Sequence, residues 1–244
     1  MPERIAETWV YLSATPLFWL TITLLAYLIA HWVYRRCGAH PLANPVMIAV
    51  ILLVVLLQLT DTPYDIYFSG AQFVHFLLGP ATVALAIPLY GQVQRLRRMA
   101  GPLMVALVTG SLTAILSAVL IGHWLGGSLP TVLSLAPKSV TTPIAMGIAE
   151  QLGGLPSLAA IMVIATGIIG AVTAQSIMRW LRVTDPAISG FALGVSAHGI
   201  GTARAFQLND TMGAFAALGM GLNGMLTAMS LPTLMQSLKS LLGL

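Results

Sequence analysis

The sequence predicts an all-α, polytopic integral membrane protein with about seven transmembrane helices and one further segment that prolines interrupt. Hydrophobic residues make up 57% of the 244 residues and charged residues 7%. Mean hydropathy is +0.90, far from the balance of a soluble domain of this length. A bilayer core of roughly 30 Å needs about 20 apolar helical residues per crossing. Long apolar stretches fill the chain, so we expect one membrane domain, residues 1–244, with short loops.

Seven apolar segments are long enough to cross a membrane. The predicted spans are residues 17–34, 42–60, 74–93, 101–125, 156–181, 187–207 and 212–237. A further apolar segment, residues 129–153, contains three prolines, each of which removes a helical hydrogen bond. We expect it to be broken or re-entrant, although the residues leave a full crossing open. Only a re-entrant path places Arg179 and Arg182 on the cytoplasmic side.

Basic residues predict the orientation of the spans. The arginines after the first and third predicted spans are Arg35, Arg36, Arg95, Arg97 and Arg98. Asp61 and Asp65 follow the second span. Cytoplasmic loops carry an excess of Lys and Arg. We therefore expect the N-terminus outside and the C-terminus, with Lys239, in the cytoplasm.

Composition also excludes several classes of protein. The net charge of +4 comes from basic residues that are scattered over short loops, so nucleic-acid binding is not expected. The single Cys37 cannot form an internal disulfide. The sequence contains no His-Glu-x-x-His, Cys-x-x-Cys or phosphate-binding Gly-x-x-x-x-Gly-Lys motif. We expect no enzyme activity, no cofactor and no metal site.

One candidate site lies in residues 135–143. Pro137 and Pro143 would each break a helix at membrane depth, which is tolerated only where protein or water replaces the lost bond. The candidate substrate-binding residues here are Lys138, Ser139, Thr141 and Thr142. An ammonium, three hydroxyls and freed helix-terminal amides suit a carboxylate. The alternative is that Lys138 reaches to the interface and the hydroxyls bond to their own helix.

A second candidate site lies in residues 190–206, which are rich in glycine. Its candidate substrate-binding residues are Ser196, His198, Thr202 and Arg204. A helix break at Gly199 or Gly201 would let them converge. Arg204 offers a bidentate fork for a carboxylate, and His198 could carry a coupled proton. The alternatives are an Arg204–Asp210 pair at the surface and a His198 that only joins helices.

Other residues give weaker signals. A repeat at an offset of 57 residues pairs Pro80 with Pro137, each beside a hydroxyl, as in transporters with two broken helices. Glu150 either exchanges a proton near Lys138 or lies in a loop. Asn223, among small residues, is expected to hold helices together.

Three stretches are similar to the LrgB/CidB family of bacterial membrane proteins. They are residues 77–90, 135–145 and 194–205, within a family core at 70–235. Residues 1–35, an N-terminal extension and first span, match the family pattern least. The resemblance implies a holin-like protein of the bacterial cytoplasmic membrane that acts with an LrgA/CidA-like partner on murein hydrolase activity and autolysis. It also implies transport, because plant relatives resemble glycolate/glycerate translocators and bacterial members are linked to pyruvate.

We therefore expect a carrier of small monocarboxylates such as pyruvate, glycolate or glycerate, coupled to a proton and using alternating access around broken helices. The alternative is a holin- or antiholin-like modulator of autolysis. Small-residue faces would pack helices within one chain or across a homodimer, and the sequence does not decide between these.

Overall fold

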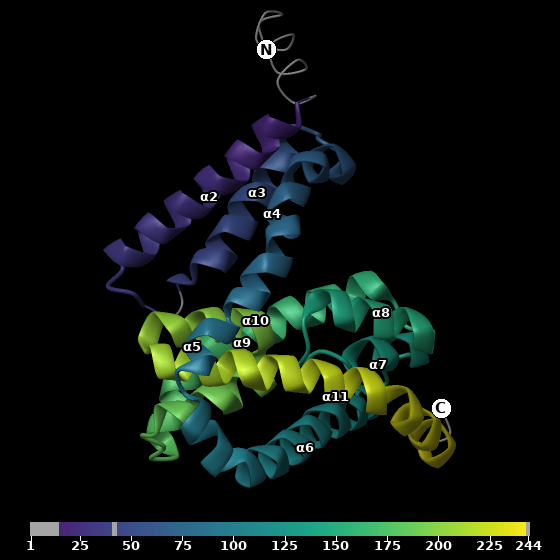
Figure 1. Cartoon of the computed structure of the whole chain (residues 1–244). Coiled ribbons are helices and arrows are strands. Elements are labelled where there is room, and N and C mark those ends of the chain that lie inside the picture. Colours follow the sequence, from purple (N-terminus) through teal and green to yellow (C-terminus); the bar gives the residue numbers. More distant parts are fainter. Residues whose placement is uncertain (1–14, 41–42, 243–244) are drawn as a thin grey trace, which may run out of the picture. The chain divides into compact units, whose positions relative to one another are not determined.

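The computed structural model describes residues 15–40 and 43–242, which form α-helices joined by short loops, with no strand among them. The chain divides into two compact units, Met1–Ala84 and Leu85–Leu244 (Figure 1). The all-helical class and the membrane-protein character predicted from composition agree with this architecture.

The described part of the first unit contains three helices. They are α2 (Pro16–Arg36), α3 (Pro45–Leu59) and α4 (Tyr64–Ala84). α2 and α3 begin with proline, whose missing amide costs nothing in the first turn. The side chain of Asn44 caps α3 by accepting a bond from the Val46 amide at 2.9 Å. α2 packs against both other helices, and Trp19 is fully buried there.

The described part of the second unit contains seven helices. They are α5 (Ala86–Tyr90), α6 (Val93–Trp124), α7 (Leu129–Leu135), α8 (Thr142–Leu152), α9 (Pro156–Trp180), α10 (Pro186–Leu208) and α11 (Asp210–Leu242). Prolines again lie in the first turns of α7, α8, α9 and α10. α10 and α11 make the most extensive contact in the chain.

Within the described residues, five stretches are long and apolar enough to cross a membrane. They are Pro16–Arg36, Tyr64–Tyr90, Val93–Trp124, Pro156–Trp180 and Asp210–Leu238. α3 is a shorter apolar helix of 15 residues. At 1.5 Å per residue it is only about 22 Å long.

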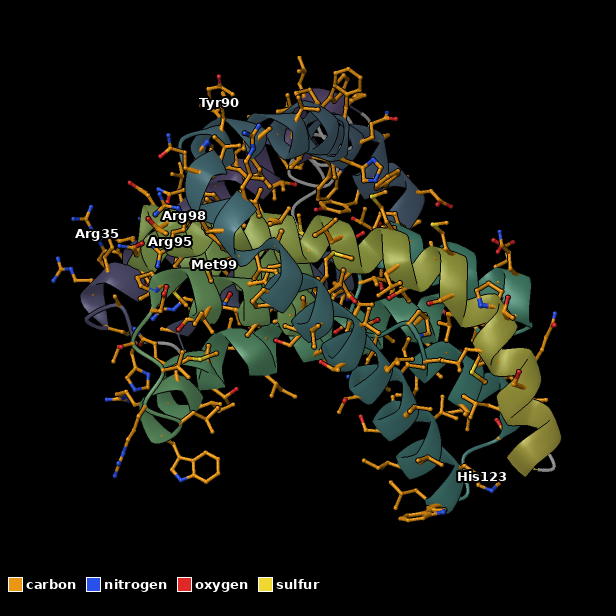
Figure 2. The ribbon with its side chains drawn as sticks, turned by 60° about the horizontal axis from the view of Figure 1, so that its bottom comes forward. Arg35, Tyr90, Arg95, Arg98, Met99 and His123 are labelled. Carbon is orange, nitrogen blue, oxygen red and sulfur yellow. The ribbon has the colours of Figure 1, made fainter. Side chains whose placement is uncertain are left out.

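An ion pair defines one end of the second unit. Arg95, in the first turn of α6, donates to Asp185, directly before α10, at 2.6 Å. Figure 2 shows Arg95 and Arg98 at this end of α6 and His123 at the other. We call these two ends the arginine end and the His123 end. Because only four residues separate Asp185 from the last residue of α9, α9 finishes at the arginine end.

α7 and α8 form a hairpin that enters and leaves at the His123 end. Gly122, near the end of α6, lies against Val132 and Leu135 of α7. The amide of Leu155, just before α9, donates to Ser134 Oγ at 2.7 Å. The chain therefore reaches α9 at the end where α6 finished. Residues 129–153 form a helical hairpin with a break at residues 136–141, and whether this hairpin is re-entrant stays a prediction.

α10 is a second hairpin, which enters and leaves at the arginine end. Its backbone leaves the helical region at His198, with φ 42° and ψ −132°. Asp185 precedes α10 and Thr211 follows it, yet Asp185 bonds to Arg95 and Thr211 to Gln92 at 3.5 Å. Both ends of α10 therefore lie beside the first turn of α6. We call residues 186–197 the outgoing arm and residues 199–208 the return arm.

The predicted crossing at residues 187–207 is therefore wrong, because the chain reverses in its middle. This changes the expected position of the C-terminal helix. α11 starts at the arginine end and runs to the His123 end, where Leu231 and Met235 pack against Val119 and Val132. Figure 1 shows α10 toward one end of α11, and α7 and α8 toward the other. The last turns of α11 thus lie opposite Arg95, not on its side as predicted.

Candidate functional site

The two hairpins meet at one side chain of α11. Asn223 Nδ2 donates to the carbonyl oxygens of Ser139 and Val195, both at 3.1 Å. In a regular helix the Val195 carbonyl would accept from the Gly199 amide, but the reversal at His198 interrupts that ladder. Ser139 lies in the break between α7 and α8. Asn223, 2% exposed, thus supplies donors to one carbonyl in each hairpin tip.

His198 forms the tip of the α10 hairpin and is fixed against α9. Its Nε2 donates to the Val163 carbonyl at 2.9 Å, so Nε2 carries a hydrogen, because a carbonyl can only accept. A Cβ at Gly167 would lie 2.8 Å from His198 Cε1, so only glycine fits beneath the ring. Thr202 Oγ1 donates to the His198 carbonyl at 2.8 Å. These contacts hold a backbone conformation that non-glycine residues rarely adopt.

Lys138 brings a positive charge to the tips. Its half-buried side chain donates to Ser139 Oγ at 3.2 Å. Because Asn223 bonds to both Ser139 and Val195, Lys138 and Ser139 of one hairpin lie near the tip of the other.

Two helix amino ends face the same region. α8 begins at Thr142, three residues after Ser139, with Thr141 as its N-cap residue. The return arm of α10 begins directly after His198. Helix amino ends present unpaired amides and a partial positive charge. Asn223 occupies one carbonyl in each break, and the helix amides and the Lys138 ammonium in these breaks are groups that favour an anion.

The residues that interrupt the helices differ from the predicted set. Pro137 lies in the break at 136–141, but Pro143 lies in the first turn of α8, where proline starts a helix rather than breaking it. Pro80 lies inside α4, which continues to Ala84. The chain instead leaves the helix at Leu85, next to Ala84, whose carbonyl the ring of Pro88 would crowd.

These placements also bear on the repeat and on the glycines. Pro80 and Pro137, the central pair of the predicted repeat, stand in different surroundings, so the repeat gains no support. Gly199 begins the return arm, whereas Gly201 packs against the Leu193 carbonyl of the outgoing arm.

Three predicted site residues do not join the cluster of Lys138, Ser139 and His198. Ser196 is exposed and bonds back to the Ala192 carbonyl at 2.8 Å. Arg204 is buried and donates to Gln207 Oε1 at 3.2 Å; it lies six residues beyond His198, about 9 Å along the return arm. Glu150 is exposed near the far end of α8, about 12 Å along the helix from Thr142. Glu150 is therefore poorly placed to partner Lys138.

A cavity of about 320 Å³ opens at the base of the α10 hairpin. It lies at the arginine end, between the end of α9, both arms of α10 and the start of α11. Gln175, Arg179, Ser189 and Asn209 contribute its polar lining. Nowhere in the described ranges could a group of three or more His, Cys, Asp or Glu residues hold a metal ion.

Comparisons with known proteins agree with one another. The model of the LrgB-like family matches residues 23–237. The chain is 38% identical over 216 residues to YwbG of Bacillus subtilis (strain 168), covering 88% of this chain and 96% of that protein. It is 29% identical over 223 residues to "Antiholin-like protein LrgB" of Bacillus cereus (strain B4264), covering 91% and 97%. No solved structure matches this chain. The name of the Bacillus cereus protein describes that relative as antiholin-like, and neither name specifies a substrate.

Proposed function

The chain belongs to the LrgB-like family of membrane proteins, and from that premise and the geometry of the hairpin tips we propose that it carries small monocarboxylate anions across a membrane. One observation supports this most. Asn223 bonds to one carbonyl in each hairpin tip, and the same two breaks contain helix amides and the Lys138 ammonium. A buried ammonium is costly at membrane depth unless it has a partner, and a carboxylate provides one.

Hydroxyls around Lys138 would form hydrogen bonds with the rest of the substrate. Ser139 already contacts Lys138, and Thr141 and Thr142 are partly buried at the start of α8. A 2-oxo or 2-hydroxy group beside the carboxylate would bond to these hydroxyls. Pyruvate, glycolate and glycerate have this chemistry and a size suited to the space between two hairpin tips.

The two hairpins would close the two sides of the membrane in turn. The α7–α8 hairpin comes from the His123 end and the α10 hairpin from the arginine end, so a ligand at the tips is covered from both. Moving the return arm of α10 would connect the tips to the cavity at its base. Buried Arg204 on that arm would attract the anion as it leaves. Broken helices with a site near the midplane are used in this way by many transporters.

The arginine end would face the cytoplasm of a bacterium. Arg95 and Arg98 begin α6 there, and Arg179 and Arg182 lie at the end of α9. An excess of arginine marks cytoplasmic loops. The last turns of α11 would then lie on the outer side.

Uptake of labelled pyruvate, glycolate and glycerate into proteoliposomes tests this proposal. Wild type should show saturable uptake of at least one acid, and Lys138→Ala should lose it while inserting normally. Arg98→Ala is the matched control, since it removes a positive charge from the exposed end of α6. Equal saturable uptake by wild type and Lys138→Ala would refute the site.

A second function is favoured by the names of the relatives. An antiholin-like role, with an LrgA/CidA-like partner or as a homodimer, would modulate murein hydrolase activity and autolysis. Expressing the Lys138→Ala variant in cells that lack the gene distinguishes the two functions. If Lys138→Ala restores normal autolysis although it carries no substrate, the antiholin-like role is direct; if autolysis also fails, it follows from transport.

A further inference from the structure

A chain of buried polar atoms continues from Asn223 on the side away from its amide nitrogen. Asn223 Oδ1 lies 3.5 Å from Thr227 Oγ1, and Thr227 Oγ1 lies 3.4 Å from Ser111 Oγ of α6. These three side chains are 2%, 2% and 3% exposed. They connect α11 to α6. They lie at the level of the hairpin tips, because Gly110, which precedes Ser111 in α6, lies against Val195 near the tip of α10.

The hydroxyls of Ser111 and Thr227 behave differently from those nearby. Thr109, Thr113 and Ser230, on the same two helices, bond to the carbonyl four residues earlier at 2.7–2.8 Å. This is the usual arrangement for a hydroxyl in an apolar helix. The contacts of Ser111 and Thr227 run between the helices instead. At 3.4 and 3.5 Å they are well beyond the optimum of about 2.7–2.8 Å for a bond between oxygens, so these hydrogen bonds are weak.

The orientation of Asn223 is fixed by its other contacts. Its Nδ2 donates to two carbonyls, which an amide oxygen could not do. The atom that faces Thr227 is therefore oxygen. One side chain thus has its donor toward the anion region and its acceptor toward Thr227 and Ser111.

We infer that Ser111, Asn223 and Thr227 form a binding site for a sodium-sized monovalent cation. All three ligand atoms are oxygens, as hard cations require. Oxygens that are neighbours around a cation with metal–oxygen distances of about 2.4 Å stand roughly 3.4 Å apart, close to the two spacings observed. The three ligands are neutral, whereas divalent cations are held by carboxylates. Water would complete the coordination.

This cation site rests on the proposed function, since it supplies the ion that moves with the anion. A cation at membrane depth is costly by itself, and the nearby Lys138 adds repulsion. An anion bound at the tips would offset both effects. Asn223 contacts the two regions directly, so each ligand should increase the affinity for the other by the same factor.

Ion replacement in wild-type proteoliposomes tests the site without any mutation. An inward sodium gradient should raise the initial rate of uptake at least tenfold over potassium or choline at equal ionic strength. Thr227→Val removes one hydroxyl and keeps the side-chain shape, so uptake should remain Lys138-dependent but lose the sodium effect. Thr113→Val on α6, which removes an exposed hydroxyl that bonds to its own helix, should keep that effect.

The outcomes distinguish the cation site from the proposed function. Lys138-dependent uptake that is equal in sodium, potassium and choline would overturn the cation site but not the proposed carrier function. Uptake that is stimulated only by an inward proton gradient would also overturn the cation site and would indicate His198 as the coupling residue. If no acid is carried, thermal unfolding in detergent still decides the cation site. Sodium should raise the Tm of wild type relative to potassium and leave that of Thr227→Val unchanged; equal shifts in both proteins would overturn the site.

Discussion

Asn223 Nδ2 lies 3.1 Å from the carbonyl oxygen of Val195, three residues before the chain of α10 reverses. The same nitrogen lies 3.1 Å from the carbonyl oxygen of Ser139 in the other hairpin. A single amide on the continuous helix α11 therefore holds two broken segments together. Without it, each tip would be left with a carbonyl that lacks this donor, which would weaken the preference for an anion.

Asn223→Leu should destabilise the protein more than most substitutions. A buried carbonyl left without its donor costs about 1–3 kcal/mol, and this substitution affects two. We expect a clear fall in Tm in detergent and loss of uptake. Asn44→Ala is the control, because it removes only the cap at the Val46 and Met47 amides of α3, worth about 0.5–2 kcal/mol, and should leave uptake intact. Equal effects of the two substitutions would contradict the bridging role of Asn223.

Gly167→Ala should displace His198. The added Cβ would meet His198 Cε1 at 2.8 Å and Ile200 Cδ1 at the same distance, so the α10 tip must shift. We expect the maximal rate of uptake to fall at least tenfold. Gly147→Ala in α8 is the matched control, since a Cβ there meets nothing within 4 Å. Uptake by Gly167→Ala as fast as by Gly147→Ala would show that the position of His198 does not matter.

The ion pair at the arginine end should make stability depend on acid pH. Burial alone would raise the pKa of Asp185, but bonds from the Ala187 amide and from Arg95 outweigh it and hold that pKa below its usual value. Its contribution is therefore present above the unfolded pKa, about 3.9, and is lost as pH falls through the lower folded value. Because the pair is partly exposed, we expect at most about 1 kcal/mol.

Thermal unfolding of wild type and Asp185→Asn from pH 7 to pH 3 measures this contribution. The difference in Tm between them should be largest at neutral pH and shrink toward pH 3. A difference that stays constant over this range would contradict the assigned role of the carboxylate.

The reversal of α10 makes a prediction about topology. With Cys37→Ser as background, cysteines introduced as Arg98→Cys and Gln236→Cys should be labelled from opposite sides of the membrane by an impermeant maleimide. Arg98 lies at the arginine end and Gln236 in the part of α11 near the His123 end. Labelling of both from the same side would mean that residues 186–208 cross the membrane.

Hydropathy predicts most of this fold because a long apolar helix has a direct signature in sequence. The segments expected at 101–125 and 156–181 end within one residue of α6 and α9. The α10 hairpin was missed because its length equals one crossing and its reversal occurs at His198, which is neither glycine nor proline. The glycines around His198 indicate a break in the helix, but they do not indicate that the chain reverses its direction there.

The candidate site was predictable where charge makes a residue conspicuous. Lys138 stands out because a lysine at membrane depth is costly. Asn223 does not, since an asparagine among glycines is equally typical of helix packing, and only the positions of Ser139 and Val195 show what it binds. Pro80 was overrated because transmembrane helices tolerate proline when neighbouring groups replace the lost bond.

Equilibrium binding of radiolabelled pyruvate, glycolate and glycerate to the purified protein tests the central claim most directly, because it requires no coupling ion or partner. We expect saturable binding of at least one acid by wild type and by Arg98→Ala, and at least tenfold weaker binding by Lys138→Ala with an unchanged Tm. Binding that is equally tight in Lys138→Ala would contradict an anion site at the hairpin tips.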